Sequence, residues 1–428
     1  MKKKVVLLIV ALVSFYALFS QDATSPDIKD VKHTVKKGWI FGPLPAVGYT
    51  SDQGFQYGVL SDLFYFGNGT KYPQYLHKFN FEISRYTKGS GVYHLFYDSK
   101  YLLSNIRTTF DISYLTDRML DFYGFNGYAT DYDMSRGDWY YKIDRSLFRV
   151  TADFQGNFAK NIGWALGAGY YKYNIKAADK PDEISSLSLY ETLQNYYIIN
   201  PIEAYGGTII EFKAGLVHDS RNIEADPTRG FYTEAILTTA PKIGNSNRGY
   251  TRFSLIHRGY LPVIGDKLTF AYRLGYQDKI GGHIPFYALQ NLTTLFFRQI
   301  TSEGLGGINS VRGVLRNRIV GDGVFWSNFE LRYRFCNFSF LGQEWYLVAH
   351  PFIDAGRVVN YYNEPVAILT LMPIPEYYDE LRDSMHWSAG LGFKAIMNKN
   401  FVISVEYGKP FNKQDGKSGM NIGLNYIF

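Results

Sequence analysis

Apolar and polar residues alternate at a period of two along most of this chain, and this pattern constrains its fold most strongly. In 148–155 the apolar side chains stand at even positions and the polar ones at odd positions, and 268–275, 329–335 and 401–407 repeat the alternation. Successive side chains of an extended strand point to opposite faces. The chain therefore predicts many strands, each with one apolar face and one face suited to water.

The first twenty residues have the order of a secretory signal peptide. Lys2 to Lys4 form a basic region, Val5 to Phe19 an apolar one, and the small Ser20 precedes Gln21. An uncleaved membrane helix is the alternative, but about 15 apolar residues fall short of the roughly 20 that span a bilayer. We expect residues 1–20 to be removed on secretion, 21–37 to form a short polar periplasmic segment, and 38–428 to form the folded unit.

A membrane-spanning barrel explains the strands better than a soluble sandwich does. The expected strands run over about 10 to 15 residues, whereas strands of soluble proteins usually have 5 or 6. Aromatic residues make up 18% of the chain, and barrels carry aromatic girdles at both membrane interfaces. The segment from Met420 to Phe428 also resembles the closing strand of outer-membrane barrels. Because hydrocarbon leaves unpaired backbone groups without partners, such strands must close into a barrel. We therefore predict an all-β, antiparallel transmembrane barrel in the outer membrane of a Gram-negative cell.

The gaps between strands test this prediction independently. Sixteen strands are expected near 43–49, 54–66, 76–87, 91–102, 105–116, 138–157, 162–176, 205–217, 230–240, 248–260, 267–279, 322–336, 344–358, 385–396, 400–409 and 419–428. The four longest gaps, 117–137, 177–204, 280–321 and 359–384, all follow an odd-numbered strand. Outer-membrane barrels have long loops outside the cell and short turns in the periplasm. If the first strand begins in the periplasm and the number of strands is even, every outer loop follows an odd-numbered strand, as the long gaps do here.

Composition and motifs argue against several other classes of function. Three of the six net positive charges belong to Lys2–Lys4, so the remainder has no concentrated basic face for nucleic acid. Cys336 is the only cysteine, which rules out a disulfide framework. Neither a G-x-S-x-G nor an H-E-x-x-H motif is present, and His350 is interpreted as a packed polar residue. We expect no enzymatic activity, no cofactor and no metal.

Four short motifs occur in a characteristic order. They are Gly306-Gly307 followed by Val311-Arg312-Gly313 in the longest gap, Phe352-x-Asp354-x-Gly356 on the thirteenth strand, Asp219-x-Arg221-Asn222 followed by Pro227 to Gly230 in an inner turn, and Phe122-Tyr123-Gly124 in an outer gap. Any one of them would be weak, because such tripeptides occur by chance. Together, over roughly residues 38–428, they resemble the barrel of BamA/TamA-type outer-membrane assembly factors, the bacterial surface antigen family.

This resemblance implies that the longest loop folds into the lumen and pairs Arg312 with Asp354 and Glu330, an arrangement we call the lumen latch. Alternation places both carboxylates on the lumen side of their strands, and the five donors of arginine match carboxylate geometry. Glycines 306, 307 and 313 permit the tight backbone that presents the arginine. The alternative is an ordinary solvated outer loop with an incidental arginine.

The first and last strands carry signs of a weak seam. Pro43 and Pro45 remove two backbone donors from the first strand, and proline in sheets is largely confined to edges. The last strand, which ends at Phe428, contains Gly423 and should pair with the first. We therefore predict a weakly paired seam that could act as a lateral gate, because unpaired edges recruit strands. The alternative is that the prolines simply begin the first strand at the periplasmic rim.

The resemblance implies a function in inserting proteins into the outer membrane, or in moving proteins or lipids across it. Members of the family typically carry periplasmic POTRA domains, and the 17 residues 21–37 cannot supply one. We therefore expect a barrel that contacts outer-membrane lipids, handles unfolded outer-membrane protein clients and relies on separate periplasmic accessory proteins. A pore for small solutes and a structural subunit of an envelope complex are the alternatives.

Overall fold

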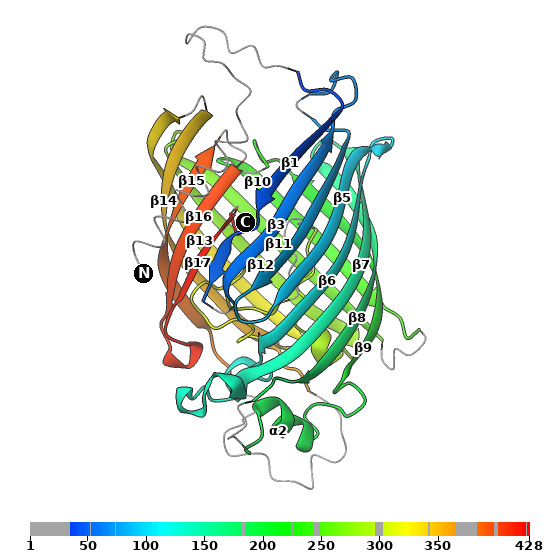
Figure 1. Cartoon of the computed structure of the whole chain (residues 1–428), viewed down its shortest axis with the longest axis vertical. Coiled ribbons are helices and arrows are strands. Elements are labelled where there is room, and N and C mark those ends of the chain that lie inside the picture. The colour runs from blue at the N-terminus through cyan, green and yellow to red at the C-terminus, as the bar shows by residue number, and fades with distance from the viewer. Residues whose placement is uncertain are drawn as a thin grey trace.

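The computed structural model describes residues 35–428 apart from 52, 73, 181–184, 225, 244–248, 296–302, 341–342, 364–382, 398–400 and 425, so the expected signal peptide lies outside the described residues. Seventeen strands form one antiparallel sheet that closes into a barrel (Figure 1). They are β1 Trp39–Pro45, β2 Gly48–Thr50, β3 Gly54–Tyr65, β4 His77–Tyr86, β5 Gly91–Leu103, β6 Ile106–Asp121, β7 Lys142–Ala159, β8 Ile162–Ala177, β9 Gly206–Asp219, β10 Gly230–Ala240, β11 Tyr250–Ile264, β12 Leu268–Gly282, β13 Gly323–Phe340, β14 Gln343–Asn360, β15 His386–Met397, β16 Phe401–Pro410 and β17 Gly419–Leu424. Among the described residues, no helix is long and apolar enough to cross a membrane.

The predicted sixteen-stranded barrel is confirmed, because β1 and β2 are two parts of one interrupted strand. Both pair with β3, β1 along Val59–Tyr65 and β2 along Gly54–Gln56. Each expected strand corresponds to an observed one. The edges differ where β6 continues to Asp121 and β7 begins only at Lys142, because the intervening Asp138–Tyr141 forms a 3-10 helix that buries Tyr140 and Tyr141 among the loops.

The long connections that follow β6, β8, β12 and β14 leave and rejoin the wall at one end of the barrel, where the helix α2 (Leu189–Asn195) also lies, and the short turns lie at the other end (Figure 1). By the rule for outer-membrane barrels we assign the first end to the outside and the second to the periplasm. The outer loops pack together: the rings of Phe122 and Tyr190 lie 5.8 Å apart, and those of Phe125 and Tyr362 lie 4.5 Å apart. A packed apolar layer therefore covers the outer end.

The barrel wall has the two faces that alternation predicts. On β6, Phe110, Ile112 and Tyr114 are exposed on the outside, whereas Asp111 and Ser113 are buried on the inside. The Asp111 carboxylate lies 3.0 Å from the Arg149 guanidinium of β7. An outer face of apolar and aromatic side chains suits lipid, and paired charges line the lumen.

Candidate functional site

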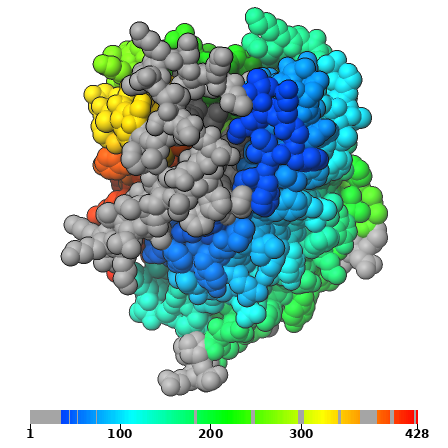
Figure 2. Space-filling view, turned by 45° about the horizontal axis from the view of Figure 1, so that its top comes forward, coloured from blue at the N-terminus to red at the C-terminus, as the bar shows by residue number. Residues whose placement is uncertain are grey.

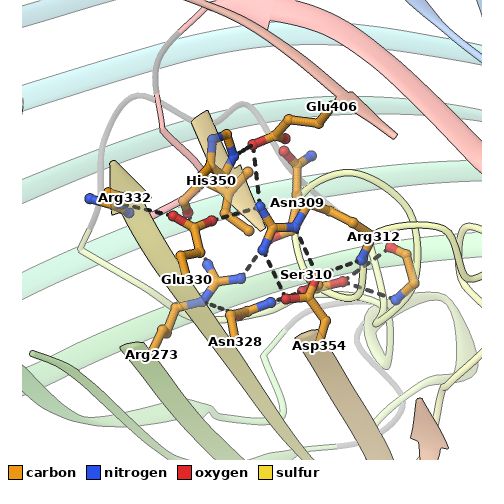
Figure 3. Close-up of polar contacts among 12 residues, drawn as sticks. Arg273, Asn309, Ser310, Arg312, Asn328, Glu330, Arg332, His350, Asp354 and Glu406 are labelled. Atoms are coloured by element: carbon orange, nitrogen blue, oxygen red, sulfur yellow. Dashed lines mark hydrogen bonds and ion pairs between the residues drawn. The ribbon is translucent and has the colours of Figure 1, made fainter. Parts of the chain in front are cut away.

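The Arg312 side chain, carried by the loop between β12 and β13, is buried in the lumen against three carboxylates from three strands (Figure 3). Its Nε and Nη2 each donate to Asp354 of β14 at 2.8 Å, and Nη1 donates to Glu330 of β13 at 2.6 Å. Nη1 also donates to Glu406 of β16 at 3.2 Å, and the guanidinium carbon lies 3.6 Å from the centre of the Phe352 ring. The two-pronged pairing with Asp354 fixes the orientation of the guanidinium as well as its position.

Glycines allow the loop to approach the wall this closely. Gly313 has φ +90°, and a Cβ there would lie 2.4 Å from the backbone of Gly408 on β16. Gly306 has φ +107°, and a Cβ there would lie 2.0 Å from the Leu315 carbonyl oxygen. Gly307 also has positive φ, +76°. Any side chain at Gly306 or Gly313 would therefore be strained and would clash.

On its other face, the loop that carries Arg312 packs against the barrel wall through apolar side chains. Val311 is fully buried in a cluster with Leu305 and Ile319 of the loop and with Trp326 and Val358 of the wall. A Cβ at Gly356 would lie 3.0 Å from Val311. Each residue of the Phe352-x-Asp354-x-Gly356 motif therefore has its own role. Phe352 places its ring against the Arg312 guanidinium, Asp354 accepts the hydrogen bonds of Arg312, and Gly356 leaves room for the side chain of Val311.

Sequence reasoning missed Glu406, which shares one carboxylate oxygen among several donors. His350 Nε2 lies 2.9 Å and Lys394 Nζ 3.0 Å from its Oε1. Ligand atoms of Glu330, His350 and Glu406 lie within 4.8 Å of one another, close enough to suggest a metal. The carboxylate oxygens already face Arg312 and Lys394, whose positive charges would repel a cation. The cluster suits an ion-pair network rather than a metal site.

The last residues of the sequence do not complete the seam. β17 ends at Leu424, and Tyr426, Ile427 and Phe428 are buried, with Tyr426 beside Tyr346 and Val348 of β14 and Phe428 beside Tyr260 of β11. Phe428, which we expected at the seam, lies instead inside the barrel beside β11 and β12. We call residues 426–428 the lumen tail.

Two lumen arginines contact the lumen tail, and one of them, Arg273, also contacts the loop that carries Arg312. Arg273 of β12 donates to the Ile427 carbonyl oxygen and to the Asn309 carbonyl oxygen, each at 3.0 Å. Arg332 of β13 donates to the Phe428 main-chain oxygen at 3.1 Å and to Glu330 at 2.7 Å. Arg273 therefore anchors both the tail and the loop, and Arg332 joins the tail to Glu330, which pairs with Arg312.

The seam itself is short. Among the described residues, β17 pairs with β2 only through Asn421–Thr50 and Ile422–Tyr49, whereas β13 and β14 share fifteen residue pairs. In the residue-by-residue pairing of the described strands, β1 pairs with β3 alone. Pro43 and Pro45 lie within β1, opposite Ser61 and Val59 of β3. β1 begins at Trp39, four residues before Pro43, so the prolines do not mark its start. Gly423 lies one residue beyond the last seam pair.

A scan against protein-family models matches residues 77–428 to the Omp85 superfamily domain. The chain belongs to the Omp85 superfamily. A search of curated proteins finds no match. The matched region includes fourteen of the sixteen strand positions, the loop with Arg312 and the motif around Asp354. Within this range the chain is an outer-membrane barrel of a superfamily concerned with protein insertion and translocation.

Two solved structures show the same fold. BamA from Haemophilus ducreyi lacking POTRA domains 1–3 matches with a TM-score of 0.57 at 16% identity, over 98% of this chain and 78% of that one. CdiB from Escherichia coli matches with a TM-score of 0.53 at 12% identity, over 91% of this chain and 63% of that one. This Omp85 chain thus spans less than two thirds of the CdiB chain. At these identities the likeness establishes the barrel fold alone.

The Asp219–Gly230 motif of this Omp85 barrel builds a rigid periplasmic turn. Arg221 donates to both carboxylate oxygens of Asp219, at 2.9 and 2.8 Å. Burial alone would lower the pKa of Arg221, but the hydrogen bonds and the charge of Asp219 hold this pKa above its usual value. The Asn222 side chain accepts from the Thr228 backbone at 3.1 Å, and a Cβ at Gly230 would lie 2.2 Å from the Ser220 carbonyl oxygen. Pro227 is buried in this turn.

Replacing Arg273 and Arg332 together by methionine should release the lumen tail of this Omp85 barrel. In a Cys336→Ser background, Ile427→Cys should be poorly reactive toward a bulky maleimide, because Ile427 is only 6% exposed. We expect labelling to rise at least tenfold in the double methionine variant. Arg149→Met, which removes a lumen arginine that pairs with Asp111, is the matched control and should leave labelling unchanged. Equal labelling of all three proteins would show that the arginines do not hold the tail.

Proposed function

We propose that this barrel assists the insertion or translocation of proteins at the outer membrane, together with separate periplasmic partners, by opening between β2 and β17. The observation that carries the proposal is the seam of two residue pairs. Among the described residues, no other two neighbouring strands share so few pairs. The next fewest, three, join β2 to β3, and there the pairing continues along β1. This boundary is the one that separates at the smallest cost in backbone hydrogen bonds.

An open seam would present a strand edge to an incoming strand. In the pairing of the described strands only one edge of β1 has a partner, β3, and an unpaired edge in hydrocarbon costs several kcal/mol for each unsatisfied backbone group. A client strand that pairs with this edge would remove that cost, in the manner of strand addition to an exposed sheet edge. The chemistry needed is backbone hydrogen bonding, which accepts clients of many sequences.

The lumen latch and the lumen tail support a gate at the seam rather than a central pore. Arg312 lies against β13, β14 and β16, and the tail crosses to the same wall from the end of β17. These contacts fill lumen space beside the seam and hold the last strand to the inner wall. We propose that the latch stabilises the closed barrel and that client binding displaces the tail.

Reconstitution tests this function directly. The purified protein in liposomes should speed the folding of a urea-unfolded outer-membrane barrel at least several-fold over protein-free liposomes, measured by heat-modifiable gel mobility. In cells, depletion should lower the levels of other outer-membrane barrels. Steady conductance in planar bilayers, with neither effect on barrels, would instead identify a solute pore. If the protein shows neither conductance nor an effect on other barrels, the remaining function is that of a structural subunit of an envelope complex.

A further inference from the structure

Three hairpin tips at the periplasmic end carry exposed apolar side chains. On the β5–β6 tip Leu102 and Leu103 are 47% and 43% exposed, on the β7–β8 tip Phe158 is 61% exposed, and on the β11–β12 tip Val263 and Ile264 are 56% and 58% exposed. Figure 2, in which this end is turned toward the viewer, shows the cyan and teal turns of the first two hairpins at the rim. Exposed apolar clusters of this kind commonly mark interaction sites when water surrounds them.

The tips stand beyond the barrel wall. The pairing of β4 with β5 ends at Asp98, that of β6 with β7 at Gly156, and that of β10 with β11 at Tyr260. The segments 100–103, 157–160 and 261–264 continue past these points with every residue exposed. Along the wall, by contrast, exposed and buried residues alternate, as at 110–114 of β6. A lipid leaflet contacts only the outward face of a strand, so it would cover only part of these tips.

The same rim is positively charged. Among the described residues of this end, the exposed cations are Lys36, Lys37, Lys71, Lys100, Lys160, Arg229 and Lys267, and the exposed anions are Glu224, Asp266 and Glu344. Each of the three apolar tips carries one lysine: Lys100, Lys160 or Lys267. No described carboxylate lies within ion-pair distance of these three ammonium groups, so their charge is available to a partner.

We propose that the three tips form a docking surface for a periplasmic protein whose own surface is acidic around an apolar patch. The lysines select the partner by charge, and the leucine, phenylalanine, valine and isoleucine side chains supply the buried contact area. This inference rests on the proposed function, because it names the surface on which the separate periplasmic partner binds.

Photo-crosslinking in intact cells tests the docking surface without reference to insertion activity. With p-benzoylphenylalanine at position 102, 158 or 264, we expect an adduct with one periplasmic protein, and none at Phe110, which faces lipid on the wall. Replacing the three tip lysines by glutamate should reduce the adduct at least tenfold, whereas replacing them by arginine should preserve it. An adduct that persists after charge reversal, or no protein adduct at any tip, would overturn the proposal.

Two further measurements separate the possible occupants. The crosslinked protein, once identified by mass spectrometry and purified, should bind the whole barrel at least tenfold more weakly at 300 mM than at 50 mM NaCl, because exposed charges are screened. In parallel, a bimane label on Leu102→Cys in liposomes should not be quenched by doxyl lipids, whereas one on Ile112→Cys should be. Quenching at position 102 would identify lipid as the occupant and overturn the proposal. The folding assay in liposomes reports on the proposed function separately, so the two can fail independently.

Discussion

Arg312→Met should destabilise the closed barrel and release its longest loop. Removing one partner of a buried ion pair typically costs about 3–5 kcal/mol, because the remaining charge stays buried and unpaired. Asp354 would lose the only cation that pairs with it among the described residues, whereas Glu330 keeps Arg332 and Glu406 keeps Lys394. The temperature at which the folded gel species disappears should fall markedly, and added protease should cut within 303–322.

Two further variants separate the charge from the seating of the loop. Arg312→Met with Asp354→Asn should recover part of the lost stability, because the uncompensated carboxylate is gone. Gly408→Val leaves every charge in place but fills the space where a Cβ would lie 2.6 Å from the Arg312 carbonyl oxygen, and should release the loop alone. If Arg312→Met kept both the unfolding temperature and the protease resistance of the parent, the latch would contribute nothing to closure.

A disulfide across the seam should abolish the proposed function reversibly. Tyr49 and Ile422 are directly paired between β2 and β17, and paired residues of antiparallel strands lie about 4.5–5.5 Å apart at Cα, within the range that a disulfide bridges. With both changed to cysteine and Cys336 changed to serine, oxidation should reduce client folding in liposomes at least tenfold. Dithiothreitol should restore it.

The matched control joins two strands that need not part. Tyr407 of β16 and Met420 of β17 are also directly paired, and the disulfide between cysteines at these positions leaves the seam free to open. Oxidation of this protein should leave client folding near the parental rate. Full activity of the oxidised seam variant, with the disulfide shown to be complete, would mean that the barrel works without lateral opening.

Most of the wall could be predicted because strand alternation is local. Period-two patterns locate each strand, and the parity of the long gaps sets their direction, so the sixteen-stranded barrel follows from short stretches of sequence. The edges at Asp121 and Lys142 could not be placed, because they depend on how the connection between β6 and β7 packs on itself: the Tyr141 ring lies 5.2 Å from the rings of Tyr123 and Tyr132. Periodicity alone does not report such packing.

The contacts inside the lumen could not be predicted from local sequence patterns. The pairing of Arg312 with Asp354 and Glu330 came from a family resemblance, and the contact with Glu406 depends on which strand lies across the loop. The inward course of the tail depends on Arg273 and Arg332, which lie 154 and 96 residues away in sequence from the carbonyl groups they bind. Alternation at Met420, Ile422 and Tyr426 predicts a straight strand, and these long-range contacts override it.

We propose that the boundary between β2 and β17 is the weakest part of the closed wall. Amide hydrogen exchange of the protein in lipid nanodiscs measures this most directly, because exchange reports the local free energy of opening. Peptides that cover β1, β2 and β17 should exchange at least a hundredfold faster than peptides that cover β13 and β14. Equally slow exchange across the whole wall would show that this boundary is no weaker than the others.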